Sequence, residues 1–264
     1  MIDVSSKKRI VLKLGTSTLT HKTGKLNIRR MTNLVRILSD LHNAGKELLL
    51  VSSGAVGMGV GKLNLPERPK DTPSKQAAAA VGQCELMHIY DDMFSKYNVT
   101  VAQILLTRAT LTNERLPHVQ NTIGRLLEMG VIPIVNENDT VAIDELELEI
   151  GENDSLSATV AAAVGADLLI ILSDINGLYS ADPRTDANAQ VIREVRKIDA
   201  RIEQMAGGAG SALGSGGMAT KITAAELCMD ANIPMLVANG DKQGLLYDIV
   251  DGKQVGTLFS RNNE

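Results

Sequence analysis

A glycine-rich segment that runs into an amphipathic helix is the part of this chain most typical of phosphate binding. It covers residues 210–221 and reads GSALGSGGMATK. Glycines leave backbone N–H groups open to a ligand, and a helix start adds unpaired donors and partial positive charge. Lys221 would add a full charge, but it follows Thr220 and precedes Ile222, which is not the Walker A spacing. From this segment alone, a phosphate-binding loop and a flexible connector are both open.

A second lysine interrupts a predicted core strand. Residues 9–14 are largely apolar and β-branched and lead into Gly15, Thr16 and Ser17, as a buried strand feeding a functional loop does. Burying Lys13 is costly unless an anion or a carboxylate meets its ammonium group. Lys13 therefore either points into a site or extends from an edge strand into solvent.

Short polar residues follow four predicted strands. The clusters are Gly15–Ser17, Ser52–Gly54, Asn136–Asp139 and Ser173–Asp174. Each cluster alone could be a simple turn. In parallel sheets, however, ligands bind outside the carboxyl ends of the strands, so four such clusters predict one site at that edge.

Strand and helix patterns alternate along the whole chain. This alternation predicts an α/β fold, a three-layer sandwich with a mostly parallel central sheet and helices on both faces, as a single domain over residues 1–264. Local signals include a helix capped by Asn27 and ended by Gly45, and either a late start or a kink at Pro117 for the helix in 112–129. An acidic strand is expected over 144–150. The expected helix segments are 28–41, 74–97, 112–129, 156–164 with Asn153 or Asp154 as a possible cap, and one ending near Asp230.

Composition excludes several classes of function. A net charge of -4, a pI near 5.7, six Phe and Tyr residues and no Trp leave neither a basic surface nor a stacking platform for nucleic acid. The apolar run after Arg9 is too short for a signal peptide or a membrane span, so we expect a cytoplasmic protein. Cys84 and Cys228 fall in helical patterns and are expected to be reduced and partly buried. No metal-binding spacing is present among cysteines or histidines.

Phosphoryl transfer suits the set of candidate residues. They include two lysines, a phosphate-binding loop, carboxylates and amides, without a Ser-His-Asp arrangement or a catalytic cysteine signature. That reaction depends on positioning and on compensation of charge more than on covalent participation. An acceptor that is itself a carboxylate is already ionised near pH 7, so it needs no general base.

Taken in order, the motifs resemble those of the amino acid kinase family, and the match covers nearly the whole chain down to Gly256–Phe259. The motifs are Lys13–Ser17, Ser53–Ala55, Asn136–Asp139, Gly151–Asp154, Ser173–Asp174 with Ala181–Arg184, and Gly216–Lys221. Family members that act on aspartate or acetylglutamate usually carry a second glycine after the first-strand lysine. This chain has Gly15-Thr16-Ser17 there, which favours the members that phosphorylate glutamate.

The resemblance implies ATP-dependent phosphorylation of the side-chain carboxylate of L-glutamate, the first step of proline biosynthesis. It implies that Lys13 and Lys221 stabilise the transferring phosphoryl group and that Asp154 holds both lysines. Glutamate would bind to Ser53, Asp139 and Asn153, with Asp139 facing its ammonium. ATP would bind to Lys13, Ser173, Asp174, Ser215, Gly216, Gly217, Met218, Ala219, Thr220 and Lys221. Mg²⁺ would arrive with ATP, without a named protein ligand.

Other properties follow from the resemblance alone. It implies a homo-oligomer and proline as a feedback inhibitor, while composition alone leads us to expect no nucleic acid or membrane partner. Many relatives continue into a C-terminal PUA domain, and this sequence stops after the kinase motifs. Glu152 and Ser173 replace the Asp and Thr common at those positions and keep their chemical character.

Three alternative functions fit parts of the sequence. The nearest is a member of the same family that acts on another acid, such as aspartate or carbamate. A nucleotide-binding sensor without turnover would bind ATP and form no acyl phosphate. A nicotinamide oxidoreductase is disfavoured because no G-x-G-x-x-G follows the first strand.

Overall fold

The computed structural model describes residues 6–21, 25–112, 114–141, 153–206, 217–242 and 244–261. The chain divides into two compact units. We call Leu14–Asn153 the central unit, and Met1–Lys13 with Asp154–Glu264 the terminal unit.

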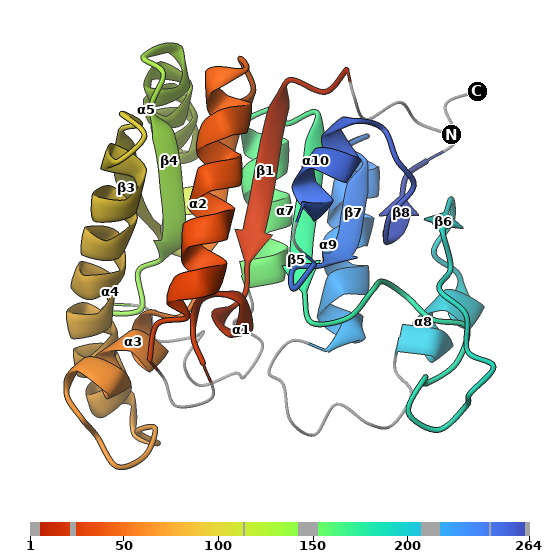
Figure 1. Ribbon diagram of the computed structural model, residues 1–264, viewed down its shortest axis with the longest axis horizontal. Helices are drawn as coiled ribbons and strands as arrows, with labels where there is room; N and C mark the ends of the chain where they lie inside the picture. The colour runs from red at the N-terminus through yellow and green to blue at the C-terminus, as the bar shows by residue number, and fades with distance from the viewer. Residues whose placement is uncertain are drawn as a thin grey trace. The chain divides into compact units, whose positions relative to one another are not determined.

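The central unit contains a parallel group of strands in the order β3-β4-β2. The strands are β2 (Glu47–Ser52), β3 (Val101–Leu106) and β4 (Ile132–Glu137). Its helices are α1 (Thr16–Leu19), α2 (Ile28–Asn43), α3 (Ala55–Lys62), α4 (Thr72–Ser95), the 3-10 helix η1 (Arg108–Leu111) and α5 (Leu116–Glu128). Figure 1 shows the long helices α2 and α4 running alongside these strands. Residues 48–52 of β2 are all buried, so this strand belongs to the core.

Local sequence signals set the helix boundaries of the central unit as expected. The side chain of Asn27 accepts a hydrogen bond from the Arg30 amide at 3.2 Å and caps α2. After α2 ends, Gly45 adopts φ +95°, a left-handed conformation that glycine adopts without strain. α5 begins at Leu116 with Pro117 in its first turn, which confirms the late start.

The backbones of helices α3 and α4 are in direct contact at two glycines, Gly59 and Gly82. A Cβ atom on Gly59 would overlap the backbone of Ala78, and one on Gly82 would overlap the backbone of Ala55. The alanine-rich stretch of α4 lies at this contact. Ala78 and Ala79 are buried in a cluster with Ala55 and Val56 of α3, because only small residues permit such a close approach.

We expect Gly82→Ala to lower the free energy of unfolding by about 1–3 kcal/mol or more, because the added methyl group must push the two helices apart. Urea denaturation monitored by circular dichroism measures this change. The matched control is Gly124→Ala in α5, where nothing lies within 4 Å of the added carbon. That variant should be neutral or more stable by roughly 0.5–1 kcal/mol. Equal stabilities for the two variants would contradict the close packing.

The terminal unit carries strands in the order β1-β5-β7-β8-β6. They are β1 (Arg9–Leu14, whose last residue belongs to the central unit), β5 (Leu168–Ser173), β6 (Glu194–Val195), β7 (Met235–Asn239) and β8 (Thr257–Phe259). β7 and β8 pair antiparallel, whereas β5 with β7 and β6 with β8 pair parallel. The expectation of a mostly parallel sheet is therefore confirmed.

Helices cover both faces of the strands in the terminal unit. They are α7 (Asn153–Ala163), α8 (Ala200–Ala206), α9 (Met218–Asp230) and α10 (Leu245–Val250). Figure 1 shows α10 on one face of β7 and α9 on the other, as the layered fold class requires.

Several expectations need correction or lie outside the described residues. Asn153 and Asp154 form the first turn of α7 and do not precede it as caps, because their side chains bind elsewhere. Cys84 is exposed, while Cys228 is buried and burial raises the pKa of its thiol to about 12. The expected acidic strand 144–150 lies outside the described part of the chain. No described helix is both long and apolar enough to cross a membrane.

Candidate functional site

Two lysines of the terminal unit share one buried carboxylate. Lys13 Nζ lies 2.8 Å from Asp154 Oδ1, and Lys221 Nζ lies 3.1 Å from Asp154 Oδ2. β1 supplies Lys13, the first turn of α7 supplies Asp154 and the first turns of α9 supply Lys221. The side chains of Lys13 and Lys221 are only 8% and 4% exposed, and that of Asp154 is fully buried. We call these three residues the lysine cluster.

The electrostatics of the lysine cluster favour an anion. Burial alone would raise the pKa of Asp154, but the two ammonium groups outweigh burial and hold that pKa below its ordinary value. Asp154 is therefore ionised at neutral pH, and among these three residues two ammonium groups face one carboxylate. A buried excess positive charge is unfavourable unless an anion compensates it. The cluster is thus suited to bind a phosphoryl group.

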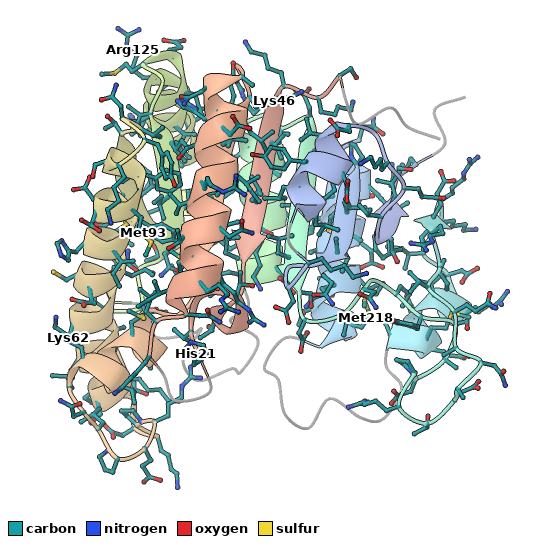
Figure 2. The ribbon with its side chains drawn as sticks, in the orientation of Figure 1. His21, Lys46, Lys62, Met93, Arg125 and Met218 are labelled. Atoms are coloured by element: carbon teal, nitrogen blue, oxygen red, sulfur yellow. The ribbon has the colours of Figure 1, made fainter. Side chains whose placement is uncertain are left out.

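The start of α9 adjoins the lysine cluster. The Thr220 hydroxyl lies 3.0 Å from Asp154 Oδ2 and 2.9 Å from the carbonyl oxygen of Gly217. Met218, labelled in Figure 2, is the first residue of this 13-residue helix, and Ala219 follows it. The backbone N–H groups of a first helical turn have no partner within the helix and favour anions. Ser215 and Gly216 lie outside the described residues.

Ser173 and Asp174 lie at the carboxyl end of β5. The Ser173 hydroxyl donates to Asp174 Oδ1 at 3.2 Å, and Asp174 is exposed. At the carboxyl end of the neighbouring strand β7, Asn239 Nδ2 donates to Asn176 Oδ1 at 3.1 Å, and Asn176 Nδ2 donates to the Tyr179 hydroxyl at 2.9 Å. Sequence reasoning did not single out Asn176, which follows β5, or Asn239, the last residue of β7, although both lie at strand ends where it expected the site.

In the central unit, the amide of Asn153 joins the ends of two strands. Asn153 Nδ2 lies 2.6 Å from the carbonyl oxygen of Ser52, 3.0 Å from Ser53 Oγ and 2.9 Å from Asn136 Oδ1. Ser52 Oγ in turn lies 3.0 Å from the hydroxyl of Tyr90, and burial raises the pKa of this phenol well above its usual range. These neutral hydrogen bonds hold the Ser52–Ser53 turn against α4 and β4.

The hydrogen bonds also determine which polar groups face a ligand. The Ser52 carbonyl can only accept, so the atom that faces it is the nitrogen of the Asn153 amide. Asn153 Oδ1 is then left as an acceptor. Ser53 Oγ accepts from Asn153, so its hydroxyl hydrogen is left as a donor. Within the described residues, one donor and one acceptor next to each other match the carboxylate and ammonium of an amino acid.

Asp139 lies in the turn after β4 and is half-buried, outside the hydrogen bonds that Asn153 makes within the described part of the chain. The structure therefore brings together Lys13, Asp154, Thr220 and Lys221 in one set, and Ser53 and Asn153 in another. No group of three His, Cys, Asp or Glu residues able to hold a metal ion occurs among the described residues.

A sequence model of the amino acid kinase family matches residues 8–239. The chain belongs to the amino acid kinase family. Curated relatives include the glutamate 5-kinase of Clostridium perfringens, 53% identical over 96% of this chain and 95% of that protein. The glutamate 5-kinase of Listeria innocua is 52% identical over 99% and 96% of the two chains. That of Carboxydothermus hydrogenoformans is 52% identical over 96% of this chain and 68% of its own length.

Solved structures of UMP kinases share this amino acid kinase fold. The enzyme from Ureaplasma parvum has a TM-score of 0.65 at 17% identity, covering 97% of this chain and 99% of its own. The enzyme from Bacillus anthracis has a TM-score of 0.63 at 19% identity, covering 97% of each chain. At such low identity the likeness supports the fold alone.

Proposed function

We propose that this amino acid kinase transfers the terminal phosphoryl group of ATP to the side-chain carboxylate of L-glutamate, giving L-glutamyl 5-phosphate for proline biosynthesis. The observation that carries the proposal is the buried lysine cluster, with two ammonium groups on one carboxylate. The choice of glutamate as acceptor is supported by the glutamate 5-kinases, which are about half identical to this chain over nearly its full length.

In this proposal Lys13 and Lys221 contact the phosphoryl group during its transfer. Negative charge on that group is compensated by ammonium groups that are already desolvated and held in place, so little reorganisation is needed during the reaction. Asp154 sets the positions of both ammonium groups and does not itself contact the phosphoryl group. The attacking oxygen belongs to a carboxylate that is ionised at neutral pH, so no general base is required.

ATP would be held by the start of α9 and by the end of β5. Gly217, Met218, Ala219 and Thr220 lie where backbone N–H groups suit phosphate oxygens, and Ser215 and Gly216 are assigned to the same role from the sequence motif. Ser173 and Asp174 would contact the rest of the nucleotide.

Mg²⁺ would arrive bound to the phosphates of ATP. The carboxylate oxygens of Asp154 are used by the two lysines, so Asp154 is unsuited as a ligand for the ion. Phosphate oxygens and water would supply its coordination, as is common for Mg²⁺. The ion would add positive charge on the phosphates, while the residues described above bind and orient the two substrates.

Glutamate would bind through Ser53, Asn153 and Asp139. The free hydroxyl hydrogen of Ser53 suits a substrate carboxylate, and Asn153 Oδ1 suits the ammonium group. Asp139 would supply the negative charge opposite that ammonium.

A product-trapping assay tests the proposed activity. Purified protein is incubated with L-glutamate, ATP, Mg²⁺ and hydroxylamine, which converts an acyl phosphate to a hydroxamate. We expect hydroxamate with glutamate and far less with aspartate or with carbamate-forming mixtures. ATP binding without hydroxamate would instead indicate a sensor, and turnover of aspartate but not glutamate would exclude the proposed acceptor.

Two further properties belong to the proposal because the family implies them. Adding proline to the trapping assay tests feedback inhibition, which would appear as a lower rate at subsaturating glutamate. Light scattering on the purified protein tests the homo-oligomer. A cytoplasmic location is proposed on the same basis.

We expect Ser53→Ala to raise the KM for glutamate about tenfold or more, because a hydrogen bond to a charged group is lost, while the KM for ATP stays within twofold. Steady-state kinetics with each substrate varied in turn measure the two values. The control variant Ser95→Ala removes a serine hydroxyl at the exposed end of α4. An unchanged glutamate KM in Ser53→Ala would exclude contact between this hydroxyl and the substrate.

A further inference from the structure

In the central unit, side-chain amides form a chain of hydrogen bonds from Asn153 to Asn136 and on to Gln83. We call this series the amide chain, and no sequence motif indicated Gln83. The Glu137 amide donates to the side chain of Asn136 at 2.9 Å. A backbone N–H can only donate, so the atom that receives it is the oxygen of Asn136. The nitrogen of Asn136 therefore points the other way, to Gln83 on α4 at 2.8 Å. The facing atom of Gln83 must be its oxygen, Oε1.

This orientation leaves the nitrogen of Gln83 without a hydrogen-bond partner among the described residues. Gln83 is only 7% exposed, and its Nε2 is buried. An unpaired buried donor destabilises a fold and calls for an explanation. Packing does not explain it, because an apolar side chain of similar size would fill the same space without an unpaired nitrogen of its own. The hydrogen bond that Gln83 Oε1 accepts from Asn136 does explain why a glutamine with an unpaired nitrogen stands here.

We propose that Gln83 is a positioning residue for glutamate binding, which fixes the amide of Asn136 so that Asn136 Oδ1 holds the nitrogen of Asn153. The inference rests on the proposed function, because the group that it finally orients is Asn153 Oδ1, the acceptor assigned to the substrate ammonium. Gln83 itself is not placed in contact with the substrate.

The series of hydrogen bonds from Asn153 through Asn136 to Gln83 explains why Gln83 matters. Asn153 Nδ2 has two hydrogens and three acceptors within 3.0 Å, so the acceptors compete for it. If Asn136 turns away, the nitrogen of Asn153 moves toward Ser52 and Ser53, and the acceptor atom moves with it. Removing the Gln83 acceptor is therefore expected to affect glutamate and not ATP, whose proposed contacts lie on other residues.

Two variants of Gln83 separate positioning from packing. Gln83→Met keeps the length of the side chain and removes the acceptor, and we expect it to raise the KM for glutamate roughly threefold to tenfold, the effect of one neutral hydrogen bond. The turnover number and the KM for ATP should stay within twofold. Gln83→Glu retains an oxygen at the Oε1 position, and we expect it to keep the glutamate KM within twofold of the wild type.

Thermal unfolding is measured alongside the kinetics. In Gln83→Met the unpaired nitrogen of Gln83 is removed and the nitrogen of Asn136 becomes unpaired, so the melting temperature should change little. The control Gln103→Met makes the same substitution at an exposed position on β3 and should change none of these values.

Each outcome decides the proposal. A selective rise in the glutamate KM with Gln83→Met and its recovery with Gln83→Glu support positioning. An unchanged glutamate KM, an equal rise for both substrates, equal effects of the two variants, or a Gln83→Met protein that does not fold would each overturn it. Absence of hydroxamate from the wild-type protein overturns the proposed function itself, and that result is obtained before any variant is made.

Discussion

Replacing Lys221 by alanine is expected to lower kcat by at least about a hundredfold, the scale for loss of one charged group that stabilises a transition state. Lys221 is 4% exposed and is held by Asp154 at 3.1 Å, so its ammonium is desolvated and fixed before the reaction begins. Water that enters the vacated space cannot replace a full charge. The hydroxamate rate at saturating glutamate and ATP measures the loss.

The matched control for this variant is Lys253→Ala. Lys253 also forms an ion pair, with Asp248 at 2.6 Å, but its side chain is 63% exposed. Its removal should leave kcat unchanged, because solvent screens this pair. A Lys221→Ala enzyme with near-normal turnover would show that this ammonium does not act on the phosphoryl group.

Asp154→Asn is expected to impair both stability and turnover. The variant leaves two buried ammonium groups without their counter-charge, and breaking a buried ion pair in this way typically costs about 3–5 kcal/mol of unfolding free energy. Turnover should fall by a factor of about a hundred or more, because the positions of both lysines depend on this carboxylate. Urea unfolding and the trapping assay measure the two effects on the same preparation.

The difference in stability between wild type and Asp154→Asn should depend on pH in a defined direction. The pKa of Asp154 is lowered in the folded protein from its ordinary value of 3.8, so its stabilising contribution is fully present above that value. It is lost as the pH falls below about 4 through the depressed folded pKa. The difference should thus be constant between pH 7 and 5 and shrink only in strong acid.

Asp248→Asn serves as the control for Asp154→Asn, because it removes the carboxylate of an exposed ion pair. Its unfolding free energy should stay within about 1 kcal/mol of the wild-type value. If Asp154→Asn were as stable as this control, the ammonium groups of Lys13 and Lys221 would not depend on Asp154 in the folded protein.

The sequence predicts most of the elements because their signals are local. Asn27 and Pro117 determine helix starts through groups within one turn, and the strands are recognised by short buried runs. The first turn of α7 was placed differently, because Asn153 and Asp154 have the residue types of helix caps. Their long-range partners, which local patterns do not reveal, hold them inside the helix instead.

The candidate site was only partly predictable for the same reason. Lys13, Asp154 and Lys221 were found through motifs and resemblance, whereas Gln83 belongs to no motif. One signal was available: Ala79, Gly82, Gln83 and Leu86 have the spacing of a buried helix face, and glutamine is the polar exception among them. A polar residue on a buried stripe requires a partner, but the sequence does not name that partner.

The close contact between α3 and α4 has a consequence for substrate affinity. Gly82 touches the backbone of α3 and directly precedes Gln83, while α3 begins two residues after Ser53. The distance between Ser53, the proposed substrate-binding serine, and Gln83 is therefore set by contact between the main chains of α3 and α4, and a main chain has no rotamers to adjust. If Ser53 binds glutamate as proposed, the affinity for glutamate depends on Gly59 and Gly82, the two residues without a side chain at this helix contact.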